Sequence, residues 1–85
     1  MFYVYVIEHQ KTELIHVGFT QDLSKRLKEH NQKGFIKSRK ENSWRVIYYE
    51  AYLHEIDARK REEYFRTHIG RNVIKQRIQS YLYAR

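Results

Sequence analysis

The sequence contains no cysteine and no proline, and only three of its 85 residues are glycine. Without cysteine the chain can form neither a disulfide framework nor a thiolate zinc site, which excludes the small disulfide-stapled secreted proteins. It has no apolar run near the roughly 18 residues of a membrane-spanning helix, and its N-terminus lacks the layout of a signal peptide. We therefore expect a cytoplasmic protein with a single domain over residues 1–85, since domains usually have about 50 to 250 residues.

Acidic residues are scarce relative to basic ones. The chain has 17 Lys and Arg against 10 Asp and Glu, a formal net charge of +7. Such a surplus indicates a polyanionic partner. A membrane-surface protein would need one strongly amphipathic basic helix, whereas here the basic residues lie in a polar stretch and on helices whose apolar faces are needed for a core. Nucleic acid is therefore the favoured partner, and no membrane is expected.

The hydrophobic periodicity changes between strand and helix along the chain. Six segments are predicted: strands at residues 2–8, 14–19 and 44–53, and helices at residues 22–31, 55–68 and 73–83. The first two strands are joined by a short polar link, which predicts an antiparallel hairpin. The order β-β-α-β-α-α predicts a small α+β fold, a three-stranded antiparallel sheet flanked by three helices.

Polar and small residues mark the predicted ends of the helices. Thr20 is the candidate N-cap of the first helix, Gly70 is the predicted stop of the second, and Asn72 can cap the third. Strict alternation in the third strand predicts two faces, one with Trp44, Val46 and Tyr48 and the other with Ile47, Tyr49 and Ala51.

A carboxylate interrupts the apolar stripe of the second predicted helix. Ala58, Phe65 and Ile69 follow one face of this helix, and Glu62 lies between them. An unpaired charge at a core-facing position is costly because it loses its hydration. Glu62 is therefore expected either to hold a metal ion or to lie at the edge of the stripe and pair with Arg59, Arg61 or Arg66.

Other polar residues stand beside apolar ones in the first three elements. Arg26 and His30, four residues apart, share a helix face that borders the apolar stripe of Leu23 and Leu27. Tyr5 lies in the middle of the first strand, and His16 is the polar member of the second. Each has an ordinary explanation as well: a solvated basic rim, a half-buried strand tyrosine and a surface histidine.

Taken in order, these residues resemble the motifs of the GIY-YIG nuclease domain. The resemblance is to its small stand-alone bacterial form, related to the N-terminal domain of the DNA-repair excinuclease C subunit. It covers about residues 2–78, and its most specific part runs from Gly18 to Asn31, together with the WRVIYYE segment and the downstream glutamate. The matching blocks are Val4-Tyr5-Val6, Ile15-His16-Val17-Gly18-Phe19-Thr20, Asp22-Leu23, Arg26-Leu27-Lys28-Glu29-His30-Asn31, Trp44 to Glu50, and Ala58-Arg59-Lys60-Arg61-Glu62.

The resemblance implies divalent-metal-dependent hydrolysis of phosphodiester bonds in DNA on a three-stranded sheet flanked by helices. Tyr5 falls on the first motif tyrosine, which serves the attacking water, and Arg26 falls on the arginine that contacts the phosphate. Glu62 falls on the glutamate that holds a single metal ion, Mg²⁺ or Mn²⁺. His30 falls on a position often filled by a polar residue that assists the nucleophile.

The second motif departs from the family pattern, because His16 occupies the place of its tyrosine. A neutral imidazole is a better general base near pH 7 than a phenol. Our hypothesis is that His16 and His30 share proton transfer around Tyr5. The opposing hypothesis is a catalytically silent module of the same fold that keeps only nucleic-acid binding.

A basic patch on the first helix and the stretch after it is the predicted DNA contact surface. It consists of Lys25, Lys28, Lys33, Lys37, Arg39 and Lys40, with Phe35 as a candidate for stacking on a base. Because phosphate contacts carry no sequence information, we expect structure-directed or nonspecific action and salt-sensitive binding. The protein is expected to be a monomer or a weak dimer, and a protein partner that supplies targeting is left open.

Overall fold

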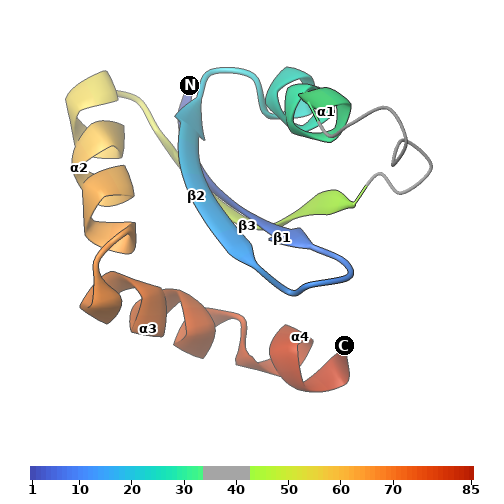
Figure 1. Ribbon diagram of the computed structural model, residues 1–85. Helices are drawn as coiled ribbons and strands as arrows, with labels where there is room; N and C mark the ends of the chain where they lie inside the picture. Colours follow the sequence, from blue (N-terminus) through green and yellow to red (C-terminus); the bar gives the residue numbers. More distant parts are fainter. Residues whose placement is uncertain (34–42) are drawn as a thin grey trace.

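Three strands and four helices make up the part of the chain that the structure describes, which is residues 1–33 and 43–85 of a computed structural model (Figure 1). In chain order the elements are β1 (Phe2–His9), β2 (Ile15–Thr20), α1 (Leu23–Lys33), β3 (Trp44–Tyr52), α2 (Glu55–Phe65), α3 (His68–Arg77) and α4 (Gln79–Ala84). The strands form one antiparallel sheet in the order β2-β1-β3. The predicted α+β class and element order are confirmed, and α4 is a further short helix. None of the helices in these two ranges is long and apolar enough to cross a membrane.

One face of the sheet carries the hydrophobic core. The helices α2, α3 and α4 follow this face, whereas α1 lies on the other side of the sheet (Figure 1). The buried core residues are Val4, Val6, Val17, Ala58, Phe65, Ile74 and Ile78. Because a two-stranded hairpin alone is marginal in water, the burial of these side chains under the helices is what stabilises the sheet.

Tyr5 lies at the centre of the opposite face, beneath α1. Both Tyr5 and Ile7 point to this side, and each is only 1% exposed. The cross-strand neighbours of Tyr5 are Gly18 on β2 and Tyr49 on β3, so these residues share its face. The sheet therefore separates an apolar core on one side from a site with polar groups on the other.

A β-bulge in β3 changes which of its residues share a face. Tyr48 pairs with Val6, but Val46 pairs with the next residue, Ile7, so Ile47 is an extra residue in the register. The extra residue shifts the side-chain period by one position. The β3 residues on the α1 face are therefore Trp44, Val46, Tyr49 and Ala51, and the predicted grouping of Trp44 and Val46 with Tyr48 is wrong.

The corner between α2 and α3 is built around a glycine that does not end a helix. Thr67 caps α3: its Oγ1 accepts a hydrogen bond from Gly70 N at 3.0 Å and donates one to Tyr64 O at 2.7 Å. Gly70 is buried within α3, where a Cβ would lie 1.9 Å from Tyr64 O. The predicted stop at Gly70 is therefore wrong, because this glycine serves the close approach of two helices and α2 already ends at Phe65.

The earlier end of α2 also overturns two expectations for the residues that follow. Ile69, predicted in the core-facing stripe of the second helix, belongs to α3 and is 67% exposed. Asn72 lies within α3 and is not its cap. The predicted helix over residues 73–83 is divided at Ile78, and both Ile74 and Ile78 are buried.

The helix α4 is fastened to the sheet through a buried carboxylate. Glu8 on β1 is 1% exposed, accepts a hydrogen bond from the Tyr81 hydroxyl and forms an ion pair with Arg85. Arg45 on β3 also donates to the Tyr81 hydroxyl, at 2.6 Å. These partners compensate the desolvation of Glu8 and anchor the last helix to two strands.

Candidate active site

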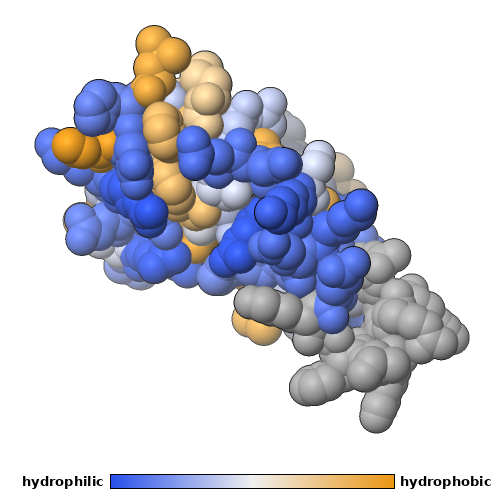
Figure 2. All heavy atoms as spheres, turned by 90° about the horizontal axis from the view of Figure 1, so that it is seen from above, coloured by the Kyte–Doolittle hydropathy of each residue, from blue (hydrophilic) through white to orange (hydrophobic). Residues whose placement is uncertain are grey.

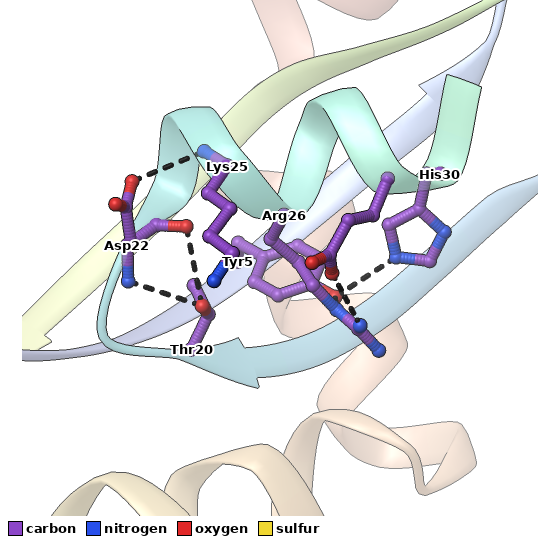
Figure 3. A network of polar contacts seen from close by, with 7 residues as sticks. Tyr5, Thr20, Asp22, Lys25, Arg26 and His30 are labelled. Carbon is purple, nitrogen blue, oxygen red and sulfur yellow. Dashed lines mark hydrogen bonds and ion pairs between the residues drawn. The ribbon is translucent and has the colours of Figure 1, made fainter. Parts of the chain in front are cut away.

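The hydroxyl of Tyr5 joins β1 to α1 (Figure 3). Arg26 Nε donates a hydrogen bond to Tyr5 Oη at 3.2 Å, and His30 Nε2 lies 3.0 Å from the same oxygen. The tautomer of His30 sets the direction of the second bond. The structure thus brings together three residues that the sequence analysis selected, although Arg26 and His30 are 21 and 25 positions from Tyr5 in the chain.

Gly18 leaves the space that the Tyr5 ring occupies. The two residues are cross-strand partners in β1 and β2. A Cβ at Gly18 would lie 2.2 Å from the Tyr5 hydroxyl oxygen and 2.3 Å from Cζ, far inside van der Waals contact. The glycine of the second motif is therefore required by the position of the tyrosine of the first.

Both ends of α1 are fixed by side chains that bind the backbone. At the start, Asp22 accepts a hydrogen bond from Lys25 N at 3.0 Å, and Thr20 Oγ1 accepts one from Asp22 N at 3.1 Å (Figure 3). Asp22 is thus the N-cap, and the prediction of Thr20 in that role is wrong. Thr20 instead precedes the cap residue and accepts a hydrogen bond from its backbone N–H. At the far end, the amide of Asn31 donates to Trp44 O at 3.2 Å and accepts from Trp44 N at 2.9 Å. These contacts set the position of α1 over the sheet.

His16 lies on the edge strand β2, beside the cluster that Tyr5, Arg26 and His30 form. Its ring centroid is 6.4 Å from that of Tyr5, 5.0 Å from that of His30 and 6.5 Å from that of Trp44. His30 and Trp44 are themselves 6.3 Å apart. The two histidines that the sequence analysis paired are therefore direct neighbours in the structure.

The surroundings of His16 favour its neutral form. Burial lowers the pKa of His16 below its ordinary value of 6.5, and the positive charges of Arg66, Arg26 and Arg71 lower it further. The negative charge of Glu62 raises the pKa of His16 and partly offsets these effects. An uncharged imidazole that can accept a proton therefore predominates at pH 7.

Arg26 carries a fixed positive charge at this site. Its hydrogen bonds with Tyr5 and then with Glu29 raise the pKa of the guanidinium above its ordinary value. The contact with Glu29 is an ion pair at 3.0 Å. A guanidinium offers a planar pair of donors that matches a phosphate, so Arg26 is suited to bind a phosphodiester.

Glu62, on α2, is held by two arginines. Its Oε2 accepts a hydrogen bond from Arg66 Nη2 at 2.8 Å, and its Oε1 lies 3.8 Å from Arg59 Nη1. The side chain of Glu62 is 14% exposed. Of the explanations that the sequence left open, pairing with Arg59 and Arg66 is what the structure shows, whereas Arg61 pairs with Glu50 on β3 at 2.9 Å.

Arg66 also places Glu62 beside the edge strand. The same Nη2 atom that binds Glu62 donates to the Val17 carbonyl at 2.9 Å. Val17 follows His16 in β2, and the charge of Glu62 acts on the pKa of His16. The carboxylate therefore belongs to the same region as His16, although α2 covers the core face of the sheet.

The donor chemistry of Glu62 fits a hard divalent cation. Mg²⁺ is typically bound by one or two carboxylates, with waters and substrate phosphates in the other positions. Across residues 1–33 and 43–85, no group of three or more His, Cys, Asp and Glu side chains could hold a metal, so Glu62 would be a single protein ligand. A metal ion can bind Glu62 only if Arg66 releases the carboxylate or shares it with the ion.

Three arginines that were not among the predicted DNA contacts line the outer edge of β2. Arg59 lies on α2, Arg66 is the C-cap residue of that helix, and Arg71 lies on α3. In order along the strand, the contacts are Arg59 with the Phe19 ring (3.8 Å to the centroid), Arg66 with the Val17 carbonyl (2.9 Å) and Arg71 with the Ile15 carbonyl (3.4 Å). We call Arg59, Arg66 and Arg71 the β2-edge arginines.

The predicted basic patch is only partly within the described residues. Lys25 and Lys28 are exposed on α1. Figure 2 shows the molecule from above, a view in which hydrophilic side chains cover most of the coloured surface. Lys33 ends α1 but its side chain is not described, and Lys37, Arg39, Lys40 and Phe35 lie outside the described residues.

Comparison with known proteins identifies the family. A family model for the GIY-YIG catalytic domain matches residues 1–75. The chain therefore belongs to the GIY-YIG family, a family of endonucleases, as the resemblance indicated. Neither a search of curated proteins nor a search of solved structures gave a significant match. The matched range ends within α3, so α4 and its contacts with Glu8 lie beyond it.

Proposed function

We propose that this protein is a divalent-metal-dependent DNA endonuclease that cleaves phosphodiester bonds in a structure-directed or nonspecific manner. The observation that carries the proposal is the Tyr5 hydroxyl, which is bound by Arg26 and His30 beside a histidine whose pKa is lowered. This combination supplies a fixed cation for phosphate and a neutral base for water, two of the groups that metal-dependent phosphodiester hydrolysis requires from the protein.

In this proposal His16 is the general base and Tyr5 is a positioning residue. Tyr5 is 1% exposed and its oxygen already has two partners, so a water molecule has little access to it. His16 is half-buried on an edge strand and mostly uncharged at pH 7, which suits proton abstraction from water. Tyr5 instead orients Arg26 and His30, and His30 receives or returns protons beside His16.

Glu62 is the residue that would hold the metal ion, Mg²⁺ or Mn²⁺. When bound, the ion supplies a Lewis acid for a phosphoryl oxygen of the substrate. Arg26 binds the same phosphate and stabilises the negative charge that develops there. Lys25 and Lys28 on α1 keep the DNA backbone near these groups through charge attraction.

A plasmid-nicking assay tests the proposal. Wild-type protein with Mg²⁺ or Mn²⁺ is expected to convert supercoiled plasmid to the nicked form. Arg26→Ala and Glu62→Ala are expected to reduce the rate by about 100-fold or more, because the first removes the cation that stabilises the transition state and the second removes the residue that would hold the metal ion. Equal nicking by all three proteins would indicate a contaminating nuclease.

A second candidate function is a nucleic-acid-binding module without catalysis. The observation in its favour is the pairing of Glu62 with Arg66 and Arg59, which occupies the carboxylate that the metal would need. Metal-independent DNA binding by wild type, with no nicking under any metal and unchanged binding in Glu62→Ala, would favour this candidate.

A further inference from the structure

Arg66 holds two acceptors with one nitrogen atom. Its Nη2 donates to Glu62 Oε2 at 2.8 Å and to the Val17 carbonyl at 2.9 Å, while its side chain is 53% exposed. Glu62 is only 14% exposed, so its charge needs a partner close by. Arg66 supplies that partner from a position that is itself open to solvent and to an approaching ligand.

A divalent cation and Arg66 compete for the same carboxylate. A cation on either oxygen of the Glu62 carboxylate would lie close to the guanidinium on Oε2, and the two positive groups repel each other, strongly where solvent screening is reduced. Binding of a metal ion therefore weakens the contact of Arg66 with Glu62 and favours its release. The guanidinium then needs a new anionic acceptor, and a phosphate accepts its paired donors well.

We propose that Arg66 is an exchange residue, which neutralises Glu62 in the DNA-free protein and passes to a DNA phosphate when the carboxylate takes up a metal ion. The inference rests on the proposed function, since it assumes that Glu62 is the metal ligand. The exchange makes DNA and the metal ion bind cooperatively. A bound metal ion frees Arg66 to bind a phosphate, and a bound phosphate draws Arg66 away from the carboxylate that the metal ion needs. The retained hydrogen bond to Val17 keeps the Arg66 side chain at the β2 edge during the exchange.

The neighbouring Arg59 provides a matched control. It lies three residues before Glu62, carries the same charge and is 55% exposed, close to the 53% of Arg66. Its nitrogen is 3.8 Å from Glu62 Oε1, beyond hydrogen-bonding distance, and its guanidinium stacks on the Phe19 ring. Arg59→Gln therefore removes the same charge without removing the hydrogen bond that the exchange requires.

The test is the affinity of the protein for Mn²⁺, measured by electron paramagnetic resonance of the free ion. In the absence of DNA, Arg66→Gln is expected to bind Mn²⁺ about 10-fold more tightly than wild type, and Arg59→Gln less than about 3-fold more tightly. A phosphorothioate duplex that resists cleavage is expected to raise the affinity of wild type by about 10-fold and that of Arg66→Gln by much less. Arg66→Lys, which keeps the cation, is expected to stay close to wild type.

Two results would overturn the inference. Equal Mn²⁺ affinities for wild type and Arg66→Gln without DNA would show that Arg66 does not compete for the carboxylate. Equal increases for Arg66→Gln and Arg59→Gln would show a general effect of lost charge. Failure of the proposed function gives a different pattern: wild type would nick no plasmid with Mg²⁺ or Mn²⁺, and Glu62→Gln would have the same Mn²⁺ affinity as wild type. Thermal unfolding of each variant verifies that it is folded.

Discussion

The contact between Gly18 and Tyr5 shows that the two sequence motifs are one physical unit. The motif tyrosine occupies the volume above the motif glycine, and its hydroxyl then reaches Arg26 and His30. No other residue type leaves that volume empty. The chemistry of the site therefore depends on a residue that has no side chain.

Gly18→Ala is expected to reduce nicking by about 100-fold or more while the protein remains folded. The added methyl group must displace the rigid Tyr5 ring, and small displacements of positioning groups cost catalysis on that scale. Plasmid nicking and thermal unfolding are measured together. A variant that nicks at the wild-type rate would contradict the assignment of Tyr5 as a positioning residue.

The pH dependence of cleavage tests the role of His16. Its pKa lies below 6.5 because of burial and the positive charges of Arg66, Arg26 and Arg71, so the base form persists through neutral pH. The wild-type rate is expected to level off at neutral pH and to fall only below pH 6.5. In His16→Tyr the rate is expected to keep rising into the alkaline range, because a phenol loses its proton near pH 10. Superimposable pH–rate profiles would exclude His16 as the base.

Tyr5, Arg26 and His30 were predictable from the sequence because they fall on motif positions of the GIY-YIG family. Arg26 and His30 also stand four residues apart on one helix, so they share a face. Nothing in the sequence around Arg66 indicates its contact with Val17. The two residues are 49 positions apart, and their contact depends on how α2 lies over the sheet. The β2-edge arginines therefore became visible only in the structure.

Individual elements differ in how far their sequences determine them. The strand bounds and the start of α2 were predicted closely, because the change between strand and helical spacing is a local property. Gly70 was misassigned because a glycine that ends a helix and one that admits a close neighbour look alike in a sequence. The extra residue Ile47 was missed because a bulge depends on the partner strand.

At the level of elements, a polar network joins the edge strand β3 to α2. Glu50 accepts hydrogen bonds from the hydroxyls of Tyr48 and Tyr52, at 2.6 and 2.5 Å, and from Arg61 Nε at 2.9 Å. Burial alone would raise the pKa of Glu50, but the hydrogen bonds from Arg61 and the two tyrosines outweigh it and lower that pKa below 4.5. The stabilisation from Glu50 is therefore present above about pH 4.5 and is lost as the pH falls through the lower folded value.

The same network predicts a loss of stability in alkali. Burial, and then the hydrogen bond and charge of Glu50, raise the pKa of Tyr52 to about 12 from 10. A raised pKa means that the stabilisation from Tyr52 is complete below pH 10 and is lost as the pH rises towards 12. Tyr52→Phe is expected to cost about 0.5–1.5 kcal/mol in the free energy of unfolding at pH 7 and to reduce the alkaline loss.

Urea unfolding at pH 7 and pH 11 measures both effects of Tyr52→Phe. Tyr83→Phe is the matched control, because Tyr83 is 82% exposed on α4. The control is expected to follow wild type at both pH values. If the two variants behave alike, the Glu50 network does not contribute to stability in the way that the hydrogen bonds indicate.

At the scale of the whole molecule, basic side chains of the described residues lie on both sides of the sheet. Lys25 and Lys28 are exposed on α1, whereas the β2-edge arginines come from α2, its C-cap and α3 on the other side. A DNA strand bound at the site would contact both sets. Arg66 and Arg71 also bind backbone carbonyls at the sheet edge, which opposes pairing with another strand.

DNA binding is expected to weaken steeply with salt, and Lys25→Ala/Lys28→Ala is expected to reduce the slope of log K against log[salt] by about 2. Each lysine neutralises a phosphate and releases a counterion, so its loss removes about one unit from the slope. Fluorescence anisotropy over a salt series gives the slopes, with Lys75→Ala on α3 as an exposed control. Salt-independent binding would exclude this surface as the DNA contact.

The side-chain amide of Asn31 forms hydrogen bonds with both backbone groups of Trp44 and so connects the end of α1 to the beginning of β3. These two bonds connect the helix that carries Arg26 and His30 to the sheet that carries Tyr5. If they were lost, the end of α1 could move relative to β1. The distances from Arg26 and His30 to the Tyr5 hydroxyl therefore depend in part on an amide that belongs to neither the motif tyrosine nor the motif arginine.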